Sequence, residues 1–469
     1  MRFPVEQAML WRVRVAWRKA AVEAWMAEYE GQEIAAALAK LAEQDAAAAE
    51  EARAALEWIA GEPGLAFITQ ERIQGFCWYE LPEKWFVDLD EKLQVVTVLA
   101  EALDLLQLPR YAAICRSGTT REILDAYEVS TADGKAAFRR AAAASGITPP
   151  DLPEFEWGAV MGLEEASARS STADFLEVAV ASGDLVPGRP GWKARQKELV
   201  RAHLNVPQAG LLGQPLAQVI LTERAETWVN ARRSETRRRL LAAIANRLLQ
   251  PAELPPATAA DPVPPLRWLL SQLDDGIALT QTGNLNRTFV QQSADRFGWD
   301  FPRPPRTEDD LFDLHRLRHF AQDLGLARRS GRMLTLTAKG RRLLADPGGL
   351  WRAVAVGLLG DNQFAVFAGE LFLALLLDGA SVPDTQIKAT VEQAVAEEGF
   401  RDSRTGGLPD EHDVGWATRQ TTNLCRTLGL LVVGGDWRDR SYGLTSTGQA
   451  TALAALRARA TGPRTIPWS

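Results

Sequence analysis

The C-terminal half of the chain carries one order of hydrophobic patterns twice. In the first copy, apolar residues recur at helical spacing over 265–273 and 283–298, and the short run "IALT" between them is typical of a strand. A third helical pattern over 307–325 leads into "LARRSGRMLTLT" (326–337), which alternates on both sides of a Ser-Gly turn and so predicts a β-hairpin. Helix, short strand, helix, helix and hairpin is the order of a winged helix-turn-helix.

The second copy follows the same order over 367–377, 384–399, 414–430 and 431–446. A "LGL" triplet (324–326 and 428–430) recurs at an offset of 104 residues, and "LTAKG" (336–340) recurs as "LTSTG" (444–448) at an offset of 108. The difference of four residues falls inside the hairpin, where insertions are tolerated. We therefore predict two winged-helix modules in tandem, at 264–360 and 361–469.

The N-terminal half has helical patterns and no block of alternating period. A helix or helical hairpin is expected over 33–58, a helix capped by Asp90 over 90–108, and one long helix over 215–249. The stretch "PAELPPATAADPVPP" (251–265) holds six prolines and predicts a linker. The expected organisation is a helical domain over 1–250, possibly two subdomains, a linker over 251–263 and the two modules. The fold class is mainly α, with small β-hairpin wings.

Composition places the chain among soluble proteins that work in a reducing compartment. Of 469 residues, 46% are apolar and 24% charged, and no apolar run is long enough to span a membrane. The three cysteines are far apart in sequence, and they form no CxxC pair. This pattern favours a cytoplasmic protein and argues against both structural zinc and a disulfide framework. The basic N-terminus carries charges within its apolar stretch, so we do not expect it to be a signal peptide.

Candidate enzyme chemistry is sparse. The nucleotide-binding glycine motifs, the nucleophile elbow and the zinc-peptidase motif are all missing. His315 and His319 lie one helical turn apart, but a zinc site needs three or four ligands. Cys115 and Arg121 have the spacing of a phosphatase loop without its context, and a buried cysteine followed by a Ser/Thr helix cap is the favoured interpretation. We expect no cofactor, no metal and no enzymatic activity, with an unrecognised enzyme as the weakest alternative.

Positive charge is concentrated in the first module, although the whole chain has a net charge of −7. Residues 301–345 hold ten Lys or Arg and five Asp or Glu, a local excess of five positive charges. Such a local excess is what phosphate contact requires in an acidic protein. Arginines that merely solvate a helix surface would give the same count, so both interpretations stay open. The same holds for "ARRSETRRRL" (231–240), whose arginines fit a solvated face or a second nucleic-acid contact.

The third helix of each module has a leucine-rich face and an outward face. In the first module Leu311, Leu314, Leu317, Ala321 and Leu324 gather on the expected core side. The opposite side carries Phe312, Arg316, His319 and Asp323, and the matching positions of the second module are Trp416, Gln420, Asn423 and Thr427. Arg, Gln and Asn make paired hydrogen bonds to base edges, whereas Asp323 counts against DNA.

The predicted wing of the first module supplies Arg328, Arg329 and Arg332, with Lys339, Arg341 and Arg342 directly after it. These side chains suit phosphate contacts, which position a protein on DNA without specifying sequence. The residues that we predict to contact DNA are Arg316, His319, Arg328, Arg329, Arg332, Lys339, Gln420 and Asn423. The second wing mixes acids with arginines and is a weaker candidate.

One segment resembles a known family. "DDGIALTQTGNLNRTFVQQ" (274–292) and "LLADPGGLW" (343–351) resemble a recurring C-terminal segment of uncharacterised actinobacterial proteins that are filed with the plasmid open-reading-frame-three-like family. The resemblance covers roughly Pro264 to Leu359, about a fifth of the chain. It implies a shared module and names no activity.

These patterns favour a cytoplasmic, non-enzymatic DNA-binding protein of regulatory or mobile-element type. Its tandem winged helices would bind double-stranded DNA, and its helical half would receive a partner or signal. The alternative is a protein-interaction subunit, because exposed aromatic residues recur at equivalent positions (Phe312 and Trp416) and suit a protein–protein contact equally well. A continuous positive surface would favour DNA, and acidic or apolar faces would favour a protein partner.

Overall fold

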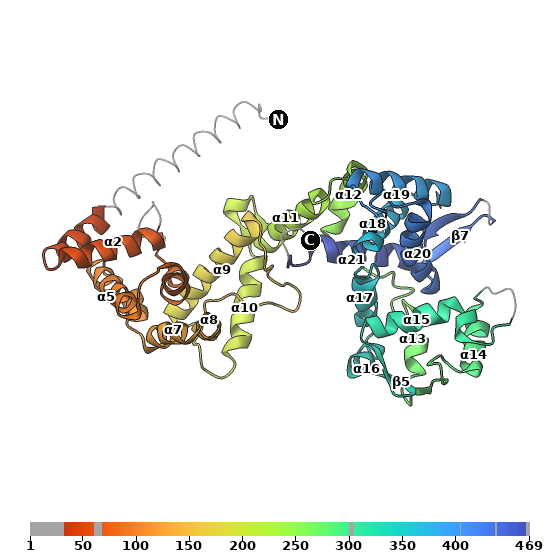
Figure 1. The fold of residues 1–469 in the computed structure, drawn as a ribbon, viewed down its shortest axis with the longest axis horizontal. Coiled ribbons are helices and arrows are strands. Elements are labelled where there is room, and N and C mark those ends of the chain that lie inside the picture. The colour runs from red at the N-terminus through yellow and green to blue at the C-terminus, as the bar shows by residue number, and fades with distance from the viewer. Residues whose placement is uncertain (1–31, 61–67, 300–303, 404, 437–438, 466–469) are drawn as a thin grey trace, which may run out of the picture. The chain divides into compact units, whose positions relative to one another are not determined.

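The structure is a computed structural model that describes residues 32–60, 68–299, 304–403, 405–436 and 439–465 (Figure 1). The described chain is mainly helical, and its eight strands are two to four residues long. This confirms the mainly α fold with small hairpins. No described helix has the length and apolar character needed to cross a membrane. The N-terminal stretch that we expected not to be a signal peptide lies outside the described residues.

The chain forms two compact units. The N-terminal unit holds residues 1–155 and 166–216, and the C-terminal unit holds residues 156–165 and 217–469. The boundary therefore lies next to residue 216, whereas the sequence predicted it at the proline-rich stretch 251–263. The two units are described separately below.

The N-terminal unit is built almost entirely from helices. Residues 32–42 and α2 (Ala46–Ala60) form the helical hairpin predicted over 33–58. The elements that follow are α3 (Gln70–Gly75), a π-helical turn (Phe76–Glu80), α4 (Leu81–Lys84), α5 (Leu89–Leu105), α6 (Pro109–Cys115), α7 (Gly118–Val129), α8 (Thr131–Ser145), α9 (Leu163–Ser182), α10 (Trp192–Asn205), β1 (Pro207–Gln208), a 3-10 turn (Ala209–Leu211) and β2 (Gln214–Pro215). The short strands β1 and β2 pair antiparallel.

Two cysteines that are far apart in sequence meet in the core of this unit. Cys77, in the π-helical turn, and Cys115, at the end of α6, are buried free thiols with their Sγ atoms 3.8 Å apart. The hydrogen bond between the thiols, together with burial, raises the pKa of Cys77 well above its ordinary value. Because a thiol must ionise to act as a nucleophile, this pair is suited to packing.

Local capping decides where several of these helices begin. Cys115 ends α6, and the Ser117 hydroxyl accepts a hydrogen bond from the Thr120 N–H at 3.1 Å to begin α7. This confirms the interpretation of a buried cysteine followed by a capping serine. The cap predicted at Asp90 was wrong, because the helix begins earlier: Asp88 caps α5 in a reciprocal pair with Glu91.

The C-terminal unit begins with two helices where the sequence predicted one. The helix is interrupted at residues 231–234, between α11 (Leu216–Asn230) and α12 (Glu235–Leu248). The Ser234 hydroxyl caps α12. Leu241, Ile244 and Leu248 on α12 are fully buried in the core of this unit. The segment 251–263 contains no helix or strand, as predicted, but the chain on both sides of it belongs to one compact unit.

The two modules follow in the predicted order. The first contains α13 (Pro264–Ser271), β3 (Ile277–Ala278), α14 (Arg287–Phe297), a 3-10 turn (Glu308–Asp310), α15 (Phe312–Asp323), β4 (Ala327–Ser330), β5 (Met333–Leu336), α16 (Ala338–Leu344) and α17 (Pro347–Gly357). The second contains α18 (Gln363–Asp378), β6 (Val382–Pro383), α19 (Asp384–Glu398), α20 (Glu411–Thr427), β7 (Leu431–Gly434), β8 (Ser441–Leu444) and α21 (Ser446–Thr461).

Both modules contain the same three-stranded antiparallel sheet. The hairpin's second strand lies in the middle, giving the orders β3-β5-β4 and β6-β8-β7. In the first sheet Leu334 and Leu336 point into the core and alternate with half-buried residues, as the period of two predicts. The core face predicted for the third helix is confirmed, since Leu311, Leu314, Leu317 and Ala321 are buried.

The modules share a single hydrophobic core with α11 and α12. Helix α17 of the first module packs on α21 of the second, and the Trp351 indole N–H donates to the Thr451 hydroxyl at 2.9 Å. Helix α12 packs on α18, α19 and α21. In Figure 1 strand β5 of the first hairpin is labelled at the lower edge of this unit, and strand β7 of the second hairpin at its upper right. The C-terminal unit is thus one packed body.

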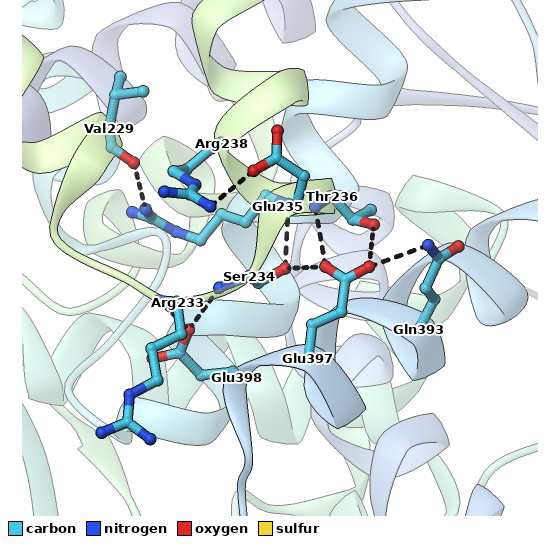
Figure 2. A network of polar contacts seen from close by, with 10 residues as sticks. Val229, Arg233, Ser234, Glu235, Thr236, Arg238, Gln393, Glu397 and Glu398 are labelled. Atoms are coloured by element: carbon cyan, nitrogen blue, oxygen red, sulfur yellow. Dashed lines mark hydrogen bonds and ion pairs between the residues drawn. The ribbon is translucent and has the colours of Figure 1, made fainter.

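A polar network joins the start of α12 to the end of α19 (Figure 2). The Glu397 carboxylate accepts from the Thr236 N–H and hydroxyl at 2.8 and 2.9 Å and from the Ser234 hydroxyl at 2.8 Å. Glu398 accepts from the N–H groups of Arg233 and Ser234 at 2.8 and 3.0 Å. Glu397 therefore satisfies the Thr236 N–H in the first turn of α12, and Glu398 satisfies the two N–H groups directly before the helix, where negative charge is also favoured by the helix dipole.

This network predicts acid sensitivity of the α12 attachment. Burial acts to raise the pKa of Glu397, but the hydrogen bonds from Thr236, Ser234 and Gln393 outweigh it and lower the pKa to about 2. A carboxyl group with a lowered pKa stabilises the fold above its unfolded pKa of about 4.3, and this stabilisation is lost as the pH falls towards 2. Glu397→Gln should therefore lower the free energy of unfolding at pH 7 and make progressively less difference below pH 4. Urea unfolding of both proteins at pH 7 and below pH 4 measures the difference in their free energies of unfolding. A difference that does not change with pH would contradict the lowered pKa of Glu397.

Candidate nucleic-acid interface

A repeated set of backbone contacts places each hairpin against its third helix. Gly325 and Gly429 end α15 and α20 with φ of 66° and 73°, a conformation that favours glycine. The next residues, Leu326 and Leu430, accept hydrogen bonds from the N–H of Thr337 and Thr445 at 2.9 and 3.1 Å. The two modules thus share their turn geometry at equivalent positions.

The "LTxxG" motif has a structural explanation. The Thr337 and Thr445 hydroxyls cap the following helices by accepting from Gly340 and Gly448 at 2.9 and 3.0 Å. A Cβ at either glycine would lie within 2.2 Å of the Leu326 or Leu430 carbonyl oxygen. Each motif therefore lets the chain leave the hairpin and begin a helix directly against the preceding turn.

The hairpin β4–β5 presents arginines to solvent. Arg328, Arg329 and Arg332 are exposed, as are Arg341 and Arg342 on α16. The Arg329 Nε donates to the Gly331 carbonyl at 3.0 Å, and its guanidinium lies against Gly283 in the turn before α14. Gly331 turns the hairpin with φ of 60°. The predicted phosphate-contacting arginines therefore lie together on a short, well-defined hairpin.

Lys339 has a structural contact in addition to its exposure. Its Nζ donates to the Leu324 carbonyl oxygen at 2.8 Å, at the C-terminal end of α15. A positive charge at this end of a helix is favoured by the helix dipole. Part of the reason for a lysine at this position is thus the attachment of α16 to α15.

The start of α15 is held by a buried acid that the sequence analysis did not single out. Glu308 is fully buried, accepts from the Leu285 N–H at 2.7 Å and pairs with Arg318 at 2.6 Å. Arg318 also donates to the Gly283 carbonyl at 3.1 Å. This pair ties the turn before α14 to α15 and so sets the angle at which α15 lies.

His319 is exposed on the outward face of α15, next to His315, with ring centroids 4.4 Å apart. Partial burial, and then the positive neighbour Arg318 and His315, lower the pKa of His319 below its ordinary value. The imidazole is therefore neutral at pH 7 and offers hydrogen bonds rather than charge. No group of three His, Cys, Asp or Glu side chains suited to a metal ion occurs among the described residues.

The two third helices pack against each other. The buried Asp313 carboxylate, in the first turn of α15, accepts from Arg426 at 2.9 and 3.0 Å and from the Thr427 hydroxyl at 2.5 Å, both in the last turn of α20. Arg316 lies in the same contact, 3.6 Å from Asp313 and 3.5 Å from Thr427, and is half-buried. We expected the side chains of Arg316 and Thr427 to face outward, without contacts to the rest of the protein. The contact between the modules engages both of them.

The outward face of α20 is free nearer its start. Gln420 is exposed, Asn423 is half-buried and Trp416 is 43% exposed, while Phe312 on α15 is 71% exposed. Near them the hairpin β7–β8 exposes Val432 and Val433, where the first hairpin exposes arginines. The two modules therefore present chemically different surfaces despite their shared fold.

One arginine of the stretch 231–240 is buried inside the unit, and two others form more exposed ion pairs. Arg237 is buried and pairs with Glu370 at 2.9 Å, Arg232 pairs with Glu398 at 3.6 Å, and Arg238 pairs with Glu235 at 2.6 Å. We expected either a solvated face or a second nucleic-acid contact, and the burial of Arg237 fits neither. A signal for the buried partner is missing from the sequence, because Glu370 lies more than a hundred residues further on.

Comparison with known proteins identifies the first module alone. Residues 268–349 match the family model described as the Y4jL N-terminal domain, a family of uncharacterised proteins. The match lies within the segment 264–359 that we singled out for its family resemblance, and it spans α13 to the first turn of α17. No curated protein and no solved structure gave a match.

Proposed function

We propose that this protein is a non-enzymatic DNA-binding protein, of regulatory or mobile-element type, that contacts the phosphates of double-stranded DNA through its first module. Both modules are interpreted as winged helices, with hairpins β4–β5 and β7–β8 as their wings. The observation that carries the proposal is the set of exposed arginines on the first hairpin and on α16 (Arg328, Arg329, Arg332, Arg341 and Arg342). Phosphate contact needs exposed cationic side chains, and Arg341 stays exposed although it lies 3.7 Å from the exposed Asp274.

Charge separates the two modules. Residues 264–345 contain 13 Lys or Arg and nine Asp or Glu, whereas residues 364–456 contain seven and 12. The first module is thus positive and the second negative. DNA is attracted to the first and repelled by the second. Gln420 and Asn423, predicted as base-reading residues, lie on the negative module and form no part of the narrower proposal.

Within the first module, His319 remains the candidate for a contact to a base edge, because it is exposed on α15. Arg316 is a weaker candidate than the sequence suggested, since Asp313 and Thr427 already engage its guanidinium. The proposal therefore predicts binding with little sequence preference, in which phosphate contacts supply most of the affinity.

A triple replacement tests the hairpin. Changing Arg328, Arg329 and Arg332 together to Ala should weaken binding to all duplexes alike. Each lost phosphate contact should reduce the slope of log affinity against log salt by about 0.9, so three should reduce it by about 2.7. Fluorescence anisotropy with a labelled random duplex over a range of salt concentrations measures both quantities.

A matched control removes three arginines elsewhere. Arg53, Arg121 and Arg195 lie in the N-terminal unit, and their side chains are 50%, 57% and 51% exposed. Their joint replacement by Ala makes the same change in net charge and should leave the slope unchanged. Equal effects of the two triple variants would remove the hairpin as the contact. Absence of salt-dependent duplex binding by the wild-type protein at low ionic strength would overturn the DNA proposal itself.

A protein-interaction subunit is the second candidate function. It is favoured by the exposed aromatic side chains of Phe312 and Trp416, which DNA phosphates do not need. The residues around Trp416 support a protein-interaction role more specifically.

A further inference from the structure

We infer that the second module binds an arginine- or lysine-bearing segment of a partner protein in a hollow beside the start of α20. The hollow has a volume of about 580 Å³, and aromatic side chains from three places in the chain line it: Phe364 on α18, Phe400 after α19 and Trp416 on α20. We call it the aromatic hollow. It is separate from the arginine hairpin, which belongs to the other module.

The walls of the aromatic hollow are held in place by packing. The Phe400 ring meets the rings of Phe364 and the buried Phe367 edge-on, each at a centroid distance of 5.1 Å. Helix α20 begins at a reciprocal cap, in which Asp410 accepts from the Asp413 N–H at 2.9 Å. Because neighbouring rings fix Phe364 and Phe400 and a cap fixes the start of the helix that carries Trp416, most of the site is formed before a ligand binds, which limits the ordering cost.

Charge at the aromatic hollow favours a cation. Asp402 and Asp413 line it, together with Arg401 and His412. Arg401 turns back to donate to the carbonyl of Phe400 at 3.2 Å. The first turn of α20 adds the exposed Glu411, and residues 364–456 carry five more acidic than basic residues. Together with Glu411, the two carboxylates outnumber the single guanidinium of Arg401, so the charge favours a guanidinium or ammonium group over a phosphate.

Aromatic rings next to carboxylates are a chemically specific combination for a cationic side chain. An arginine or lysine placed over the face of a tryptophan gains a cation–π contact, and a nearby carboxylate can form an ion pair with the same cation. Trp416 supplies the partly exposed ring, and Asp413 lies one turn before it on the same helix. An arginine of a partner segment can thus contact both, while Pro409, which also lines the hollow, meets the apolar part of that segment.

The test uses the full chain and a fluorescein-labelled peptide of alternating glycine and arginine. Its matched control peptide has citrulline, which keeps the shape of arginine without its charge. Fluorescence anisotropy should show binding of the arginine peptide and much weaker binding of the citrulline peptide. Trp416→Ala should raise the Kd of the arginine peptide about twofold to thirtyfold, the range that one cation–π contact gives.

Two further variants separate loss of the contact from loss of the fold. Trp416→Tyr keeps an aromatic face and should restore most of the affinity. Phe312→Ala removes an exposed aromatic side chain outside the hollow and should change nothing. Equal affinity of wild type and Trp416→Ala, or equal binding of the two peptides, would overturn the inference. So would a Trp416→Ala protein that binds duplex DNA less tightly but the arginine peptide normally, since the hollow would then belong to a nucleic-acid surface.

Discussion

Replacing Glu165 by alanine is expected to lower the free energy of unfolding by about 3–5 kcal/mol, because it removes the buried carboxylate that pairs with the buried Arg224. Glu165 and Arg224 have side chains that are 0% and 2% exposed. Both carboxylate oxygens accept from the Arg224 guanidinium, and one also accepts from the Gly158 N–H at 2.8 Å. Arg224 further donates to the carbonyls of Thr461 and Glu156 at 3.0 and 2.7 Å.

This pair joins three distant parts of the C-terminal unit: the segment 156–165, helix α11 and the end of α21. Urea unfolding followed by tryptophan fluorescence measures the effect. Glu164→Ala is the matched control, because Glu164 is the exposed neighbour on the same helix and its loss should cost no more than about 0.5 kcal/mol. Similar losses for the two variants would show that the pair does not hold these segments together.

The second large effect is expected at Glu370, in the middle of α18. Arg237 donates to this carboxylate through Nε at 2.9 Å, its Nη2 lies 2.9 Å from the same oxygen, and Arg459 pairs with the carboxylate at 3.3 Å. The Arg237 guanidinium also lies 4.9 Å from the ring centroid of Trp228. Glu370→Ala should therefore cost about 3–5 kcal/mol, because Arg237 is almost completely buried and would remain charged without a carboxylate.

A double replacement distinguishes the charge from the packing. When Arg237→Met and Glu370→Leu are combined, no buried charge is left unpaired, because Arg459 is 41% exposed, and the loss should be much smaller than that of Glu370→Ala. Glu392→Ala, at an exposed position on α19, serves as the control for a lost surface carboxylate. If the double variant is destabilised by as much as Glu370→Ala or more, the stabilisation comes from shape and packing and the ionic argument fails. Equilibrium unfolding in urea provides the free energies of unfolding of the wild type, Glu370→Ala, the double variant and Glu392→Ala.

Much of the C-terminal unit was predictable because its signals are local. A glycine after α15 and α20, a threonine cap after each hairpin and the glycine three residues later all act within about 25 residues of chain. These positions specify turns and helix starts through backbone sterics and short-range hydrogen bonds. The same is true of the leucine face of α15, whose helical period places Leu314, Leu317 and Ala321 together without any knowledge of what covers them.

Outward faces were harder to predict, because solvent exposure is decided by what the rest of the chain does. Arg316 has the position of a base-reading side chain, yet Thr427, 111 residues later, contacts it through the packing of the two modules. The candidate interface could be predicted as far as its side chains project from a short hairpin, as Arg328, Arg329 and Arg332 do. Where a helix face lies beside another module, the exposure of its side chains depends on packing between distant segments. No local sequence pattern indicates that packing.

The sequence by itself determined the repeated order of helices and hairpins, the positions of their turns and the positive charge of the first module. Each of these depends on residues that are close together in the chain or on a simple count of charges. Only the tertiary structure placed α12 with the second module, buried Arg237 against Glu370 and brought Phe364, Phe400 and Trp416 around one hollow. These features depend on contacts between distant segments, where the free energy comes from removing specific surfaces from water, and a chain of residues does not show which surfaces will meet.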